Sequence, residues 1–394
     1  MRTEELIVRL NDRDKEIRLN SLRELMEMTK AGEIKAPRQE NDVNNHIHTT
    51  FSFSPYSPTK AVWMAYNAGL KTAGIMDHDS LSGAREFIEA GKIVGILTTI
   101  GAECRVSMKN TPFADRRINN PDQKGIAYCT IHGVPHQHID EVIEFFRPYT
   151  AKRNERNRKM TDRINELTAP YAIHMDFDKD IVPLSEFPNG GSITERHLLF
   201  ALSGKITERF GRGAAVVRFL TEEMGITLSG KAGAYLSDSG NPYYEYDLLG
   251  TLKSSLIEKI YIDATEECPD VAEVVALADR IDAFSCYAYL GDVGDSVTGD
   301  KKTQKFEDDY LEELFAVVKE LKFKAITYMP SRNTMEQLRR VRALCEKYDF
   351  FQISGEDINS PRQSFVCEAL RDPEFANLYE STMMLIHHEA EASI

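Results

Sequence analysis

The sequence predicts an α/β fold that carries an inserted helical lobe and an N-terminal helical hairpin. From residue 43, short apolar stretches alternate with longer amphipathic ones, which is the pattern of strands and helices in turn. This rhythm stops between residues 150 and 265 and then returns, and residues 4–31 place apolar side chains at helical spacing. A chain of 394 residues, 42% of them hydrophobic, is long enough for one large α/β body with an added lobe.

The N-terminal segment should form two helices, because Asp12 and Asp14 interrupt its apolar periodicity. It is similar to one HEAT-type helical repeat, which cannot bury its apolar face alone, so we expect it to pack on the main domain. A polar stretch over residues 35–41 follows as a linker. We expect an N-terminal extension at 1–41, a main domain formed by 42–149 and 266–394, and an inserted helical cap lobe at 150–265.

The first half of the main domain should contain a strand from residue 43, strands over 72–76, 95–101 and 125–132, and helices over 58–70, 83–90 and 138–148. Ser57 and Pro58 suit a helix start, and Gly69 suits a helix end. Strand–helix–strand units at this spacing predict parallel strands joined by right-handed crossovers. Such sheets bind ligands at the carboxyl ends of their strands.

The lobe should begin with a strongly basic helix over residues 152–167 and continue as amphipathic helices that cap the mouth of the main domain. The main domain then resumes with helices over 270–280, 307–321 and 334–348 and strands over 283–290, 325–329 and 350–354.

Composition narrows the range of partners. A formal net charge of −14 argues against binding of long nucleic acids, although a short oligonucleotide or a small phosphorylated ligand remains compatible. The six cysteines are scattered, the first residues lack the apolar core of a signal peptide, and no stretch is apolar enough to cross a bilayer. We expect a cytoplasmic protein with reduced thiols and no membrane contact, and the oligomeric state stays open.

A histidine pair marks the candidate site. His46 and His48 are two residues apart on the first strand, so their rings share one face of the sheet and can hold a divalent metal. The segment Asp77-His78-Asp79 follows after a helix, again at a strand end. The alternative is that both histidines are simply polar strand residues.

Further distinctive residues follow in order: His46-x-His48-Thr49, Asp77-His78-Asp79, Gly101-Ala102-Glu103, His132 and Ser354-Gly355-Glu356-Asp357. This series resembles the PHP (polymerase and histidinol phosphatase) metal-dependent phosphoesterases over residues 43–365. Residues 155–160 and 194–197 are similar to the inserted lobe of nucleotide-phosphatase members. The resemblance implies a distorted (β/α)7 barrel that holds up to three divalent ions, with Mn, Zn and Fe as candidates.

The resemblance also implies which residues hold the metals. The first ion would be bound by His46, His48, Glu103 and Asp357. Glu103 would bridge to a second ion that His132 also binds, and His78 would bind the third. From the residues alone, Glu103 could instead be a solvated loop acid, His132 a hydrogen-bonded strand-end histidine and Asp357 a helix cap.

Three positions depart from the family pattern. Tyr289 stands where a histidine ligand is usual, Asn359 replaces the histidine of the final Asp-x-His, and residues 51–54 read Phe-Ser-Phe-Ser where an Asp or His ligand often lies. Asn and Ser are poor transition-metal ligands, and Tyr binds well only when it is deprotonated. We therefore expect one or two metals rather than three.

Basic side chains in the lobe and after the later strands are the candidates for substrate binding: Arg156, Arg158, Arg196, His197, Arg332 and Arg362. Arg156 and Arg158 could clamp a phosphate, but a basic helix also suits a solvated face paired with neighbouring glutamates. Arg196 and His197 could equally begin a helix with the ring buried. The tyrosines at 243, 244 and 246 could stack a base or simply pack the lobe.

Together these residues predict a metal-dependent hydrolase of phosphate esters that uses a metal-activated water on a small phosphorylated metabolite or nucleotide. Asp77 and His78 are the candidates for proton transfer to the leaving group. The alternative is a catalytically weakened PHP scaffold that binds metal and a phosphorylated ligand or a protein partner without turnover. Hydrolysis of a non-phosphate bond by the same metal chemistry is a third option.

Overall fold

The computed structural model describes residues 2–120, 122–292 and 307–393. Its centre is one sheet whose seven strands lie in chain order. The strands are β1 (Val43–Ile47), β2 (Thr72–His78), β3 (Leu97–Ser107), β4 (Ile126–His132), β5 (Phe284–Ala288), β6 (Ala325–Tyr328) and β7 (Phe351–Ser354). The sheet curls until its edges meet: the His48 N–H donates to the Ile358 carbonyl at 3.0 Å, and the Ile358 N–H donates to the His46 carbonyl at 3.1 Å. The expected α/β architecture is therefore present as a curled seven-stranded sheet.

Helices that alternate with the strands cover the outer face of this sheet. They are α3 (Pro58–Asn67), α4 (Ala84–Val94), α10 (Val271–Arg280), α11 (Leu311–Glu320) and α12 (Met335–Tyr348). Local sequence fixes where several of them begin: Ser57 caps α3, and capping boxes led by Asp270 and Thr334 begin α10 and α12. Their apolar faces form one large core with the sheet, in which Phe87 and Phe315 are fully buried.

Strand β4 runs antiparallel to both β3 and β5, while the other neighbouring pairs are parallel. This differs from the expected all-parallel arrangement. Among the described residues of the connection between β3 and β4 there is no crossover helix, so the chain returns directly along the neighbouring strand. As a result, the carboxyl end of β4 points away from the ends of β1 and β2, and His132 pairs with Gly101 whereas Glu103 pairs with Thr130.

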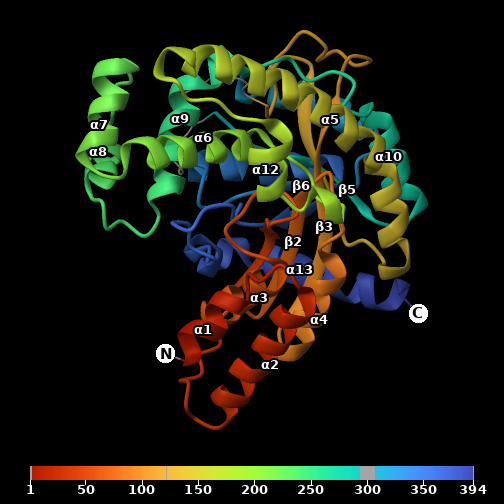
Figure 1. The fold of residues 1–394 in the computed structure, drawn as a ribbon. Coiled ribbons are helices and arrows are strands. Elements are labelled where there is room, and N and C mark those ends of the chain that lie inside the picture. The colour runs from red at the N-terminus through yellow and green to blue at the C-terminus, as the bar shows by residue number, and fades with distance from the viewer. Residues whose placement is uncertain (1, 121, 293–306, 394) are drawn as a thin grey trace.

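The N-terminal helices α1 (Arg2–Arg9) and α2 (Lys15–Lys30) lie at the opposite end of the molecule from the lobe (Figure 1). Leu10, Leu19 and Leu22 join the core of the main domain, and α2 packs on α3 and α4. The buried Arg18 donates from Nε to Glu86 of α4 at 2.8 Å. Since this pair is buried, it ties the hairpin to the sheet-covering helices.

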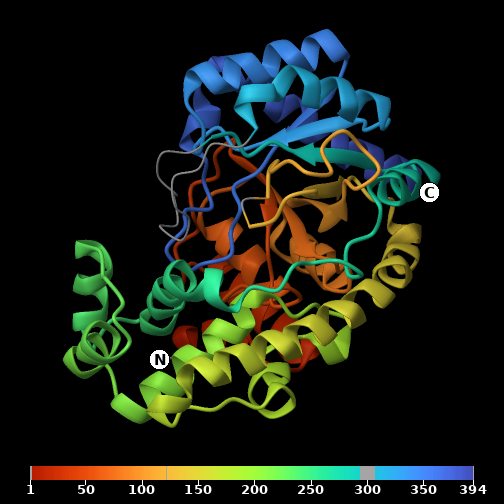
Figure 2. The same ribbon diagram turned by 90° about the horizontal axis from the view of Figure 1, so that it is seen from above.

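The inserted lobe has a separate buried core. Its helices are α5 (Ile139–Thr168), α6 (Glu195–Phe210), α7 (Ala214–Arg218), α8 (Gly230–Ser237) and α9 (Tyr244–Ile260), and Figures 1 and 2 show α6 to α9 gathered at one side of the sheet. The two helices expected at 138–148 and 152–167 are one, α5, with Pro148 inside it. Phe146 packs in the main core and Met160 in the lobe core, and this packing on both sides outweighs the hydrogen bond that proline removes. The expected boundary at 149/150 therefore lies within a continuous helix.

The last helix, α13 (Ala376–Ala392), packs against β1, β3 and β7. Its Glu389 accepts hydrogen bonds from the Ile100 N–H at 2.9 Å and from the Thr99 hydroxyl, and Thr382 accepts one from the Asn45 amide at 2.7 Å. These buried polar contacts fix the strands that carry the candidate site. None of the helices in the described part of the chain has the length and apolarity that a membrane crossing requires.

Candidate metal centre and adjoining pocket

Side chains from β1 and β3 converge at one point. One ligand atom each from His46, His48 and Glu103 lies within 4.8 Å of the others. The Nε2 atoms of both histidines are 3.6 Å from the same Glu103 oxygen, and the two rings are 5.0 Å apart. Neither Nε2 atom, although buried, makes a well-aligned hydrogen bond with any described residue. Buried nitrogen atoms left in this way suit the binding of a cation.

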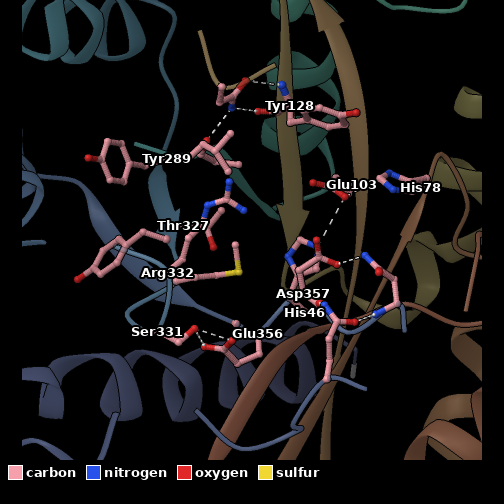
Figure 3. Close-up of a pocket in the computed structure, with 18 of the residues that line it drawn as sticks. His46, His78, Glu103, Tyr128, Tyr289, Thr327, Ser331, Arg332, Glu356 and Asp357 are labelled. Atoms are coloured by element: carbon pink, nitrogen blue, oxygen red, sulfur yellow. Dashed lines mark hydrogen bonds and ion pairs between the residues drawn. The ribbon is translucent and has the colours of Figure 1, made fainter. Parts of the chain in front are cut away.

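Asp357 and His78 complete the surroundings of this cluster. The backbone contact between Ile358 and β1 brings Asp357 Oδ1 to 3.1 Å from His48 Nε2. The Asn359 amide donates to the same Asp357 oxygen at 2.7 Å and so orients this carboxylate. His78 Nδ1 is 3.2 Å from Glu103 (Figure 3). Two imidazoles and two carboxylates are a donor set that fits one divalent transition metal or zinc ion.

The electrostatics of the cluster favour ionised carboxylates. Burial raises the pKa of Glu103, but the charges of His78, His46 and His48 outweigh this effect and bring it down to about 2. Burial likewise opposes ionisation of Asp357, yet His48 lowers its pKa below the ordinary value. For His78 burial dominates and lowers the pKa to about 3. The cluster thus holds negative charge at neutral pH, as a cation site requires.

His132 lies outside the group of three that converges within 4.8 Å. Its ring is buried, and burial lowers its pKa to about 3, with smaller effects from His46 and Glu103. Neither ring nitrogen has a hydrogen-bond partner among the described residues. A neutral imidazole with open nitrogens near Glu103 could bind a second ion, and that role stays a prediction.

Asp77 lies behind the cluster and is buried. Its Oδ1 accepts from the Thr49 N–H and the Ser52 hydroxyl, and its Oδ2 accepts from the Thr49 hydroxyl, each at 2.6 Å. The Ser52 oxygen is also 3.2 Å from His48 Nδ1. These contacts suit a residue that orients His48, and its predicted part in proton transfer is not tested by them.

Ser52→Ala or Asp77→Asn should weaken metal binding by about 10- to 100-fold, because partners behind a ligating histidine fix its tautomer and orientation. The affinity can be measured by competition with a chromogenic chelator. Ser237→Ala, at the exposed end of α8, is the matched control. Unchanged affinity in both site variants would show that His48 needs no support from this chain of contacts.

A pocket adjoins the metal cluster between the sheet and the lobe. The cluster side is lined by His46, His78, Glu103 and Asp357, and the lobe contributes Thr194, Arg196 and Lys253. The other side is lined by residues that follow β5, β6 and β7, including Tyr289, Leu290, Met329, Ser331, Arg332 and Glu356 (Figure 3). Three cationic side chains, Arg196, Lys253 and Arg332, therefore face a space that ends at the candidate metal ligands.

Two of the six predicted substrate-binding residues, Arg196 and Arg332, line this pocket. Lys253 of α9 was missed by sequence reasoning, because a lysine on an amphipathic helix carries no local signal of a site. Arg156 is buried elsewhere: its Nη1 donates to Glu195 at 2.7 Å, and its Nε lies 3.2 Å from Glu267.

The remaining three are held by protein partners outside the pocket lining. Arg158 pairs with Asp178 at 2.6 and 2.7 Å on the lobe surface. Arg362 forms two hydrogen bonds of 2.7 Å to Asp247. His197 is buried at the start of α6, where its Nδ1 accepts from the Thr194 N–H at 3.0 Å in a capping box; of the two alternatives for this residue, the structure shows the buried helix start.

Tyr289 lines the pocket, but its hydroxyl donates to Asp308 at 2.6 Å. Burial and this carboxylate raise its pKa above the ordinary value, which keeps the phenol protonated and a poor metal ligand. Phe53 packs edge-on against the His197 ring. The residues at the positions predicted to have lost a ligand thus contact other side chains. His46, His48, Glu103 and Asp357 lie together as one group of possible donors.

Glu307 holds two residues that follow β5, Leu290 and Gly291. Its environment predicts that the stability of the protein depends on pH. Glu307 is buried and accepts from the Tyr287 hydroxyl at 2.5 Å and from the N–H groups of Leu290 and Gly291 at 2.7 and 2.5 Å. Burial outweighs these hydrogen bonds and raises its pKa from 4.5 to about 7. Between these two pKa values, the folded state keeps a proton that the unfolded state has released. The free energy of unfolding should therefore fall as the pH rises through this range, by up to about 3 kcal/mol.

Urea unfolding at about pH 5 and about pH 8 measures this difference. Glu307→Gln, which resembles the protonated acid, should flatten the dependence. An equal slope in the variant and the wild type would place the titrating group elsewhere.

Comparison with known proteins supports the family. Residues 44–179 match the model of the PHP domain. No curated protein matches the chain. Among solved structures, it is similar to a protein of Bifidobacterium adolescentis provisionally described as a metal-dependent phosphoesterase, at 16% identity and a TM-score of 0.55, over 90% of this chain and 98% of that one.

It is also similar to an amidohydrolase of Chromobacterium violaceum with bound sulfate, at 14% identity and a TM-score of 0.52, over 83% of this chain and 90% of that one. At these identities the likeness is one of fold. The segment matched by the family model contains His46, His48, His78, Glu103 and His132. Residues 44–179 therefore match the PHP domain, the family whose pattern the order of the candidate ligands resembles.

Proposed function

We propose that the protein is a metal-dependent hydrolase of phosphate esters of small molecules. The observation that carries the proposal is the convergence of His46, His48, Glu103 and Asp357 at the wall of a pocket that also presents three cationic side chains. A divalent ion bound by these residues would polarise a phosphoryl oxygen and a water molecule. The fold shared with a protein described as a metal-dependent phosphoesterase supports the same class.

We assign substrate binding and proton transfer to other residues of the chain. Arg196 and Lys253 reach the pocket from the lobe. Burial raises the pKa of Asp357, but His48, His46 and, to a smaller extent, the charge of Arg196 lower it below the ordinary value. These cations would hold the oxygens of a phosphate against the cluster. His78 lines the pocket beside Glu103. Because burial lowers its pKa and keeps the ring neutral, it would accept a proton from water, whereas the predicted transfer of a proton to the leaving group would need its charged form. Asp77 would keep His48 in place.

Lys253→Met should raise the KM for a phosphate monoester by about tenfold or more, because it removes a charged hydrogen-bond donor from the pocket. Steady-state kinetics of the metal-loaded protein measures the effect. Lys259→Met, an exposed lysine on the same helix, makes the same change of charge and should leave KM unchanged. Equal kinetics in both variants would remove Lys253 from the substrate site.

The function itself is tested by assaying released phosphate from a panel of phosphomonoesters after loading with Mn, Zn or Fe. The second candidate, a PHP scaffold that binds metal and ligand without turnover, is favoured by Tyr289 and Asn359, which make contacts to carboxylates where the family has histidines. Metal uptake without hydrolysis of any phosphate ester would select the scaffold.

A further inference from the structure

The lining of the pocket contains a further carboxylate, Glu356, which directly precedes the candidate ligand Asp357. Both of its oxygens accept from the Ser331 hydroxyl, at 2.6 and 2.7 Å (Figure 3). Its backbone is fixed as well, because its N–H donates to Asn44 Oδ1 at 2.9 Å and its carbonyl accepts from Asn44 Nδ2 at 3.2 Å. Glu356 is thus a positioned acceptor, outside the predicted metal ligands, in a pocket that also presents the cations Arg196, Lys253 and Arg332.

A carboxylate is an unexpected neighbour for a phosphate ester. The negative charge of Glu356 would repel such an ester unless the ester also carries a group that donates a hydrogen bond to the carboxylate. The Ser331 hydroxyl and the Cys367 thiol have one proton each to donate, whereas a carboxylate has about four lone-pair sites, so Glu356 can accept further hydrogen bonds. The nearby cations disfavour a second positive charge in the ligand, which leaves neutral hydroxyl groups as the donors that suit this carboxylate.

We propose that Glu356, supported by Ser331, selects phosphate esters whose alcohol part carries further hydroxyl groups, that is, esters of polyols or sugars. This inference rests on the proposed function and adds the part of the substrate that remains after phosphate is removed. The phosphoryl group would lie at the His46, His48 and Glu103 side, and the hydroxyl-bearing part would extend toward the loops after β6 and β7, where Ser331 and Glu356 lie.

The test compares three esters of equal chain length: glycerol 1-phosphate, propyl phosphate and 3-aminopropyl phosphate. The wild type should prefer glycerol 1-phosphate over propyl phosphate by about 10- to 100-fold in kcat/KM, the range of a hydrogen bond to a charged group. Glu356→Gln should lose most of this preference, measured as the ratio of kcat/KM for the two esters, while it still binds metal. Glu368→Gln, an exposed acid after β7, is the control with the same change of charge.

A preference that survives in Glu356→Gln, or an equal loss on all three esters, would show that Glu356 only supports the loop. Preference for the aminopropyl ester would overturn the choice of a neutral hydroxyl. Calorimetric binding of 3-hydroxypropylphosphonate and propylphosphonate, which cannot be hydrolysed at the phosphorus–carbon bond, separates the two proposals. If no ester is hydrolysed, the proposed function fails, and the inference still stands or falls on whether the wild type binds the hydroxylated phosphonate more tightly and Glu356→Gln does not.

Discussion

Replacing His48 with alanine should abolish stoichiometric metal binding and, with it, metal-dependent phosphate release. His48 Nε2 lies 3.1 Å from Asp357 and 3.6 Å from Glu103, so it stands between the two carboxylates of the cluster. Its loss removes a ligand and leaves the two carboxylates with one imidazole fewer. The affinity should fall more than the roughly 10- to 100-fold expected for a residue that only supports a ligand.

Metal content after dialysis, measured by plasma mass spectrometry, and phosphate release are the two readouts. The wild type should retain one or two ions per chain. His387→Ala, an exposed histidine on α13, is the control for loss of a histidine in itself. Full metal content in His48→Ala would refute the assignment of the cluster, whatever the activity.

Replacing Arg156 with methionine should lower the free energy of unfolding by about 3–5 kcal/mol, the cost of leaving a buried charge without its partner. Arg156 and Arg105 share Glu195, at 2.7 and 3.1 Å, and both approach Glu267. Both arginine side chains are at most 5% exposed, so water cannot replace the missing charge. Two carboxylates would then be left with one arginine.

Arg158→Met provides the matched comparison, since Arg158 lies on the same helix and also forms an ion pair. Its pair with Asp178 is half exposed or more on both sides, so its loss should cost only about 0–1 kcal/mol. Chemical denaturation of both variants measures the difference. A raised KM for a phosphate ester at unchanged stability in Arg156→Met would restore the sequence-based prediction that Arg156 binds substrate.

Much of the candidate site could be predicted because its donors carry a local signal. His46 and His48 share a face through the period of a strand. Glu103 was expected just after a strand ending at 101, and it lies within β3, which continues to Ser107. Their convergence agrees with the predicted ligand set, and Asp357 lies within reach of His48. The family resemblance supplied the pairing of the first and last of these residues, which local spacing could not.

The substrate side was predicted less well, because sequence does not reveal what a charged side chain will meet. Arg156 and Arg158 look alike on one basic helix, yet one is buried against Glu195 and the other pairs with Asp178 at the surface. The predicted parallel direction of β4 was also wrong. Whether a strand runs parallel or antiparallel to its neighbour depends on whether the connection crosses over the sheet or returns directly. Because β4 is antiparallel to β3, His132 pairs with Gly101 and, contrary to the prediction, does not lie at the carboxyl ends of β1 and β2.

The sequence by itself determined the candidate donors and the elements that carry them: the histidine pair, the acidic residues near it, and the helix caps, all of which depend on residue type and short-range spacing. Only the tertiary structure decided that Asp357 reaches His48 and that Lys253, rather than Arg156, faces the pocket. The curl of the sheet joins residues more than three hundred positions apart, and the packing of α6 on α9 sets which cations face the pocket. Such placements depend on how whole elements pack, which no local pattern specifies.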